Sequence, residues 1–154
     1  HLYEERHTFK RDGFNLDMDG TRRLLWRSAM AGGMGGWFGF YSFSEYPYPK
    51  PEQLRTFHRF WENRLRGNFL QHKTKSTKTY SLKTHDLDKY IFYTEKSDII
   101  RMNISDILKL NSVTAIDTKK IYKKLVLNSV NLEENILHFP YKSDWAILEK
   151  NTKK

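Results

Sequence analysis

The sequence predicts two structural parts: a β-α-β-α segment of a parallel α/β barrel over residues 1–72, followed by an antiparallel β-sandwich over residues 73–154. Three observations indicate this division. All 8 glycines lie at or before Gly67. Arginine is concentrated in the first part and lysine in the second part. Apolar segments recur about every eight to twelve residues in the second part, a spacing typical of small β-sandwiches.

The first part begins with a predicted strand over residues 1–6, followed by a helix. Leu24, Leu25, Ala29 and Met30 have the spacing of one helical face. Glycine accepts a left-handed backbone without a Cβ penalty, so the Gly32-Gly33 pair is expected to end this helix.

A second strand and helix complete the first part. Residues 37–41 are apolar on both faces, which predicts a buried strand of a parallel sheet. After a loop with alternating prolines, Pro51 suits the first turn of a helix that runs to about residue 68. Its expected apolar stripe consists of Leu54, Phe57, Trp61 and Leu65.

The second part is expected to consist of short antiparallel strands. A polar turn at residues 95–98 separates two of them and predicts a hairpin. Residues 106–110 could instead form one helical turn. The predicted strands cover residues 80–82, 90–94, 99–102, 112–116, 121–127, 136–139 and 145–148.

Composition narrows the function classes. The net charge of +9 is spread over both parts with no run of five basic residues, so nucleic-acid binding is a secondary alternative. No apolar stretch is long enough to cross a membrane. Cysteine is absent and the six histidines lack paired ligand spacing, so neither thiolate chemistry nor a metal site is expected. The sequence predicts no cofactor.

Two adjacent carboxylates are the candidate catalytic residues. Glu4 and Glu5 lie where the first strand should end, and catalytic groups project from the carboxyl ends of strands in parallel barrels. One of them could be the nucleophile of a retaining glycosidase, which needs a second carboxyl about 5–5.5 Å away. Only one can face the barrel mouth, because side chains alternate along a strand. Alternatively, both are surface acids paired with Arg6 or Arg11.

Aromatic residues follow the second predicted strand, on the same rim. Such rings can stack on the apolar face of a sugar, although they could equally pack the loop. His7 could also touch a substrate, or it could be an ordinary surface histidine. The candidate substrate-binding residues are therefore Tyr41, Phe43, Tyr46, Tyr48 and His7.

Several short motifs together resemble the apiosidase-like group of glycoside hydrolases. The first half resembles the last two βα units of the TIM-type (βα)8 barrel of these enzymes, on residues 4–6, 21–26, 29–33 and 36–39. The second half resembles their small C-terminal β-domain, often labelled a collagen-binding domain, on residues 89–93, 115–117, 139–140 and 143–148. The chain departs from the family at Phe38-Gly39, where Tyr-Gly is usual.

The resemblance implies hydrolysis of a glycosidic bond, with Glu4 or Glu5 as the nucleophile and the acid/base on an earlier strand that this chain lacks. The chain is thus expected to be a fragment, inactive on its own, that meets carbohydrate through its parent enzyme and self-associates through the incomplete barrel. No nucleic-acid or membrane partner is expected. The resemblance favours a secreted or periplasmic location. The alternatives are an accessory carbohydrate- or protein-binding module and a basic nucleic-acid-binding protein.

Overall fold

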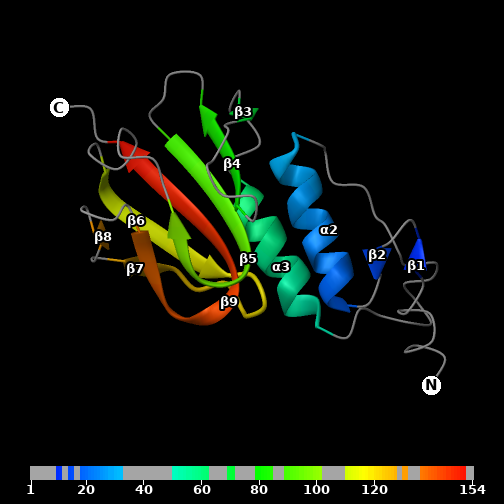
Figure 1. Cartoon of the computed structure of the whole chain (residues 1–154). Helices are drawn as coiled ribbons and strands as arrows, with labels where there is room; N and C mark the ends of the chain where they lie inside the picture. The colour runs from blue at the N-terminus through cyan, green and yellow to red at the C-terminus, as the bar shows by residue number, and fades with distance from the viewer. Residues whose placement is uncertain are drawn as a thin grey trace.

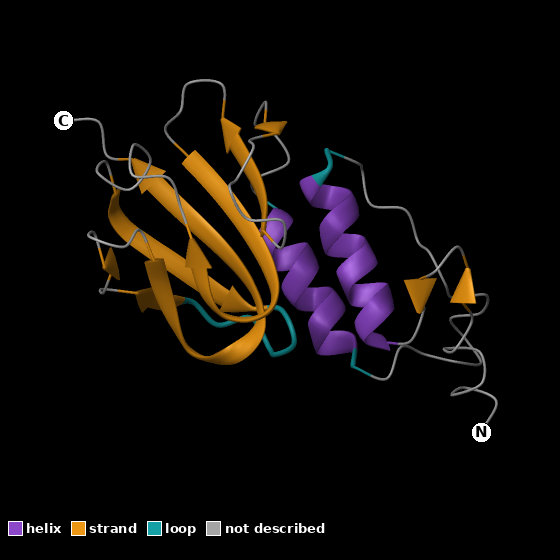
Figure 2. Ribbon diagram, viewed as in Figure 1, coloured by secondary structure: helices purple, strands orange, loops and turns teal. Residues whose placement is uncertain are grey.

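Two helices lie on one face of an antiparallel sheet in the computed structural model (Figures 1 and 2). The structure describes residues 10–11, 14–15, 18–32, 50–62, 69–71, 79–84, 89–101, 110–127, 130–131 and 136–151. The helices are α2 (Met18–Met30) and α3 (Pro51–Trp61), which run side by side in the same direction (Figure 1). The short strands β1 (Lys10–Arg11) and β2 (Phe14–Asn15) pair with each other, antiparallel, ahead of α2.

The described strands after α3 form a single sheet. It has 7 strands in the order β3-β4-β5-β9-β6-β7, with β8 also paired to β9. All the pairings are antiparallel. The strands are β3 (Phe69–Gln71), β4 (Thr79–Thr84), β5 (Lys89–Arg101), β6 (Leu110–Asp117), β7 (Leu125–Leu127), β8 (Val130–Asn131) and β9 (Ile136–Asn151).

The two longest strands, β5 and β9, bend where their pairing is irregular. Their register shifts between Thr94 and Ser97 and again between Ser97 and Ile99. Lys96, in this section, has a left-handed backbone with φ of 49°. Extra residues in one strand bend it and increase its twist. Both strands accordingly curl over at one end of the sheet (Figure 1).

The predicted fold class, a barrel segment followed by a β-sandwich, is wrong. The helices pack on one continuous antiparallel sheet instead. Residues 95–98, predicted as a turn between two strands, are an irregular section within β5. Residues 136–139 and 145–148, predicted as separate strands, belong to the single strand β9. The predicted strands at residues 1–6 and 37–41 lie outside the described residues, and the domain boundary near residue 72 stays a prediction.

Alternating side chains give the sheet two apolar faces, because successive residues of a strand point to opposite sides. In β5, Tyr90 and Phe92 join a cluster on one face, which also contains Trp145. Ile91 and Tyr93 point to the other face and pack against the helices. Both faces of β5 are therefore buried over residues 90–94, which explains the apolar run in this half of the strand.

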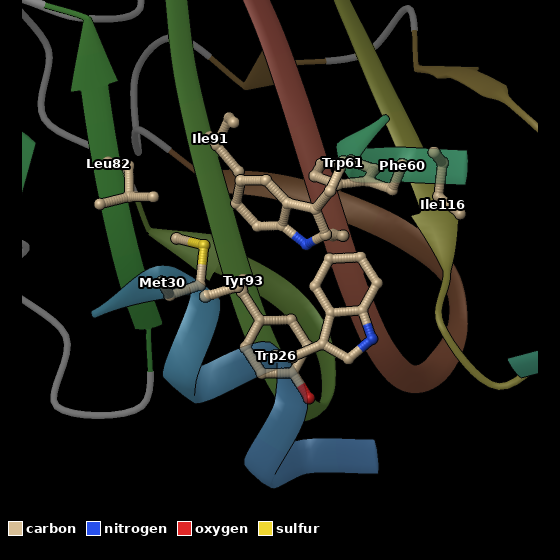
Figure 3. Packing of buried hydrophobic residues seen from close by; sticks show 10 residues of the cluster. Trp26, Met30, Phe60, Trp61, Leu82, Ile91, Tyr93 and Ile116 are labelled. Carbon is tan, nitrogen blue, oxygen red and sulfur yellow. The ribbon is translucent and has the colours of Figure 1, made fainter. Parts of the chain in front are cut away.

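The cluster between the helices and the sheet centres on Trp26 of α2, which is fully buried (Figure 3). Its indole stacks on Tyr93 of β5, with ring centroids 5.3 Å apart and an interplanar angle of 13°. Phe57 and Phe60 of α3 meet it edge-on at 5.2 and 5.0 Å. Aromatic pairs in these geometries stabilise beyond their buried area, by about 0.5–1.5 kcal/mol each. Trp26 thus links both helices to the sheet.

Helix α2 buries Leu25, Ala29 and Met30 of the predicted face, whereas Leu24 is only partly buried. The helix ends near Gly32, which has the left-handed φ of 82°. Helix α3 begins at Pro51, also as predicted. Trp61 of the expected stripe is buried as predicted, and Leu65 lies outside the described residues. The buried face is rotated from the rest of the stripe, since Gln53 and Thr56 are buried while Leu54 and Phe57 are only partly so. None of the helices in the described part of the chain is long and apolar enough to cross a membrane.

Candidate functional site: an arginine–carboxylate network between helix and sheet

The candidate residues predicted from the sequence lie outside the part of the chain that the structure describes. Their catalytic and substrate-binding roles therefore stay predictions. These residues are Glu4, Glu5, His7, Tyr41, Phe43, Tyr46 and Tyr48.

The described residues bring together a different polar group, centred on Asp144 of β9. This carboxylate is fully buried, and it accepts a hydrogen bond from Arg22 of α2, whose side chain is only 1% exposed. Arg23 donates through Nε at 2.8 Å and through a terminal nitrogen at 3.2 Å. The backbone amide of Lys96 donates at 2.9 Å. Asp144 therefore joins α2 to the irregular section of β5.

Two further carboxylates complete the network at its edges. Asp19, one turn before Arg22 on α2, accepts from that guanidinium at 2.5 Å and lies 3.5 Å from the ammonium group of Lys119. Glu95 of β5 accepts two hydrogen bonds from Arg27, at 2.8 and 2.5 Å. The three arginines of α2 are thus matched by three carboxylates. Because buried charges are tolerated only when they are paired and hydrogen-bonded, this balance permits the central pair, Arg22 and Asp144, to be buried.

The surroundings of Asp144 keep it ionised. Burial would raise the pKa of this carboxyl, but hydrogen bonds from Arg23, from the Lys96 amide and from Arg22 outweigh burial, and its pKa lies below the ordinary value. A general acid in glycoside hydrolysis needs a raised carboxyl pKa. Asp144 is therefore suited to anchoring cations and not to donating a proton at neutral pH.

A second buried carboxylate, Asp117 at the end of β6, is also saturated with hydrogen bonds. It accepts from the Ser143 hydroxyl at 2.8 Å, from the Tyr141 hydroxyl at 2.9 Å and from the Lys119 amide at 2.9 Å. The next residue, Thr118, donates from both its amide and its hydroxyl to the Asp144 carbonyl, each at 2.9 Å. The Asp117 carboxylate and the Thr118 hydrogen bonds thus fasten the end of β6 to the middle of β9.

These arrangements hold parts of the chain together and offer no reacting group. Both buried carboxylates have their acceptor positions occupied, and the guanidinium groups have no lone pair to act as a base. Among the described residues, no group of three histidine, aspartate or glutamate side chains is placed to hold a metal ion. The network can fix the helices on the sheet in one orientation.

The network was not predicted from the sequence, although the motifs at residues 21–26 and 143–148 contain its central residues. Arg22 lies four residues before Trp26, on the buried face of α2. An arginine on an apolar helix face needs a carboxylate partner, because an unpaired buried charge is costly. That argument predicts a partner for Arg22, but its identity required the fold, since Asp144 is 122 residues away in the sequence.

Sequence comparisons give no family assignment: no protein-family model matches the chain, and no curated protein matches it. A structural comparison finds a crystal structure of a glycoside hydrolase family 5 protein from Bacteroides vulgatus ATCC 8482, with a TM-score of 0.59 and 10% sequence identity. The match covers 93% of this chain and 38% of that chain. The chain therefore spans well under half the length of this structural neighbour, and the two have a similar fold over that region.

Proposed function

We propose that this chain is the C-terminal part of a glycoside hydrolase, related to the apiosidase-like group, and that it does not hydrolyse glycosidic bonds by itself. The observation that carries the proposal is the structural match, in which nearly all of this chain corresponds to 38% of a glycoside hydrolase family 5 protein. The short motifs that resemble apiosidase-like enzymes support the narrower assignment. In such an enzyme the chain would meet carbohydrate through the rest of the protein.

The chemistry of the described carboxylates supports a non-catalytic role for this region. Retaining hydrolysis needs two carboxyls about 5–5.5 Å apart, one of them with a raised pKa. Asp144 has a lowered pKa. Asp117, like Asp144, is committed to internal donors. The proposed nucleophile remains Glu5 or Glu4, with the acid/base supplied by residues beyond this chain.

The motifs behind the family resemblance also support a mechanical role. Arg22 and Trp26 belong to one of these motifs, and Asp144 belongs to another; the contacts above join them across the helix–sheet interface. Tyr93, from a third motif, stacks on Trp26. We infer that the region serves to hold the sheet rigidly on the helices, so that the sheet keeps a fixed place beside the catalytic part of the enzyme.

Comparing hydrolysis by two proteins tests the proposal: this chain alone, and a version extended by the sequence encoded upstream. Both are assayed on a panel of polysaccharides for release of reducing ends. We expect activity from the extended protein only. In that protein, one of the variants Glu5→Gln and Glu4→Gln should abolish hydrolysis and the other should retain it. Adjacent side chains of a strand point to opposite faces, so only one of the two can face the substrate. Turnover by the chain alone would contradict the non-catalytic role.

The nucleophile assignment has its own control. Loss of acid/base or nucleophile function commonly costs about 10²–10⁴-fold or more in rate. Asp98, an exposed residue of β5, gives a matched variant, Asp98→Asn, that removes one carboxylate without touching the proposed catalytic residues. Near wild-type rates in both glutamate variants would move the nucleophile elsewhere.

A further inference from the structure

A cluster of exposed cations lies where α3 meets the turn between β6 and β7, residues 118–124. Arg55 and Arg59 are four residues apart, which places them on one side of α3. The turn itself has four lysines and no acidic residue. We call this cluster the α3–turn surface; its exposed members are Arg55, Arg59, Lys120, Ile121, Lys123 and Lys124.

Contacts between α3 and the turn fix the surface. The Thr56 hydroxyl of α3 donates to the Lys120 carbonyl at 2.7 Å, and the Gln53 amide donates to the Lys119 carbonyl at 3.3 Å. The Arg59 guanidinium lies over the Tyr122 ring, 4.9 Å from its centroid. The turn between β6 and β7 therefore rests beside α3 (Figure 2). These contacts bring the basic residues of α3 close to those of the turn, although the two segments are far apart in sequence.

The charge of this region is uneven. On α3 the carboxylate of Glu52 is half-buried in the first turn, and Glu62 lies just beyond the last residue of the helix. Lys119 already faces Asp19. Within the part of the chain that the structure describes, the other lysines of the turn have one carboxylate contact, between Lys120 and Asp117 at 3.9 Å. Like charges held close together repel one another, and a polyanion relieves that repulsion.

We propose that the α3–turn surface binds an acidic polysaccharide, one whose sugars carry carboxylate groups. This inference rests on the proposed function, which makes a polysaccharide the expected polyanion. Guanidinium groups bind carboxylates through two parallel hydrogen bonds, and lysine ammonium groups add attraction with less geometric demand. The Ile121 side chain, which is 74% exposed between the lysines, offers apolar contact to the C–H face of a sugar ring.

The side chains in this region argue against single-stranded nucleic acid and a membrane surface as the ligand. Binding to single-stranded nucleic acid uses open aromatic rings on which bases stack. Here the Tyr122 ring is covered by Arg59, and the Tyr141 ring has the Lys120 ammonium 4.3 Å from its centroid. Stable binding to a membrane surface needs a larger apolar face than Ile121 supplies. An acidic polysaccharide uses what this surface has, which is mainly exposed positive charge.

The test measures binding of the whole chain to polygalacturonate by isothermal titration calorimetry, with a neutral xylan as the comparison probe. The double variant Lys123→Gln/Lys124→Gln removes two charges from the surface. The control Lys89→Gln/Arg101→Gln removes two exposed charges from the ends of β5. Both variants should keep the wild-type melting temperature, since all four side chains are exposed.

We expect the surface variant to bind polygalacturonate about tenfold more weakly, since each exposed ion pair contributes modestly, and the control to bind within about twofold of the wild type. Raising the salt to 0.5 M should weaken binding further, because it screens exposed charges. Equal losses in the two variants, or equal affinity for xylan, would overturn the proposal. So would a preference for single-stranded DNA or anionic vesicles over polygalacturonate. Those outcomes leave the hydrolysis test of the extended protein unaffected, so the two proposals fail separately.

Discussion

Replacing Asp144 by asparagine should destabilise the chain by about 3 kcal/mol. The substitution keeps the size of the side chain and removes the one carboxylate that contacts both Arg22 and Arg23 while being fully buried. Breaking a buried ion pair by removing one partner costs about 3–5 kcal/mol, because the other charge stays buried without compensation. Asp19 remains in contact with Arg22, and Glu95 lies 3.8 Å from Arg23, so we expect the lower end of that range.

The assay is urea unfolding followed by tryptophan fluorescence, with thermal unfolding in parallel. A loss of about 3 kcal/mol corresponds to a fall in Tm of about 6–12 °C for a chain of this size. Asp98→Asn removes an exposed carboxylate from the neighbouring strand and should change stability by less than about 0.5 kcal/mol. If Asp144→Asn is no more destabilising than Asp98→Asn, the network does not hold the helices on the sheet and the reasoning fails.

Lowering the pH should erase the difference in stability between the wild type and Asp144→Asn. The pKa of Asp144 in the folded chain lies below its ordinary value. A group with a lowered folded pKa stabilises the fold fully above its unfolded pKa, about 3.9, and loses that contribution as the pH falls through the folded value. The gap between wild type and Asp144→Asn should therefore be constant between pH 5 and 7 and narrow below about pH 4. A gap that widens on acidification would contradict an ionised Asp144.

Three further outcomes follow from the same interface. Trp26→Ala should cost about 3–5 kcal/mol, measured by urea unfolding, because it removes a fully buried indole and its stacking on Tyr93. Arg27→Gln should cost less than about 1 kcal/mol in the same assay, since the ion pair between Arg27 and Glu95 is partly exposed. A loss of stability as large as that of Trp26→Ala would show that exposure does not weaken this pair. Residues 73–154 expressed alone should bind an apolar dye such as ANS, because the sheet face beneath the helices is uncovered; no dye binding would show that this face needs no cover.

Local patterns predicted the helices better than the sheet. The apolar face of α2 and the start of α3 at Pro51 depend on residues close in sequence. The structure confirms the start of α3 and, apart from the partly buried Leu24, the face of α2. The continuity of β5 depends on its partner strand. Polar residues 95–98 have the composition of a turn. Pairing with β9 and the hydrogen bond from the Lys96 backbone amide to the Asp144 carboxylate nevertheless continue the strand through an irregular section. No periodicity within β5 carries that information.

The rotation of the buried face of α3 likewise depends on residues that are far away in the sequence. Apolar spacing predicted Leu54 and Phe57 on the buried side, whereas Gln53 and Thr56 are buried because they satisfy the carbonyls of Lys119 and Lys120. Buried polar groups follow hydrogen-bond partners, and these partners are more than 60 residues away in the sequence. The buried network could be anticipated only in part: the position of Arg22 indicates that a carboxylate is needed, and the fold supplies Asp144.

Native-state hydrogen exchange tests most directly whether the helices and the sheet form one unit. If the Arg22–Asp144 contact and the Trp26 cluster hold them together, the central amides of α2 and β9 should exchange with the same opening free energy. Asp144→Asn should lower both values by about 3 kcal/mol. Amides of α2 that exchange with little protection while those of β9 stay protected, in wild type and variant alike, would contradict the account.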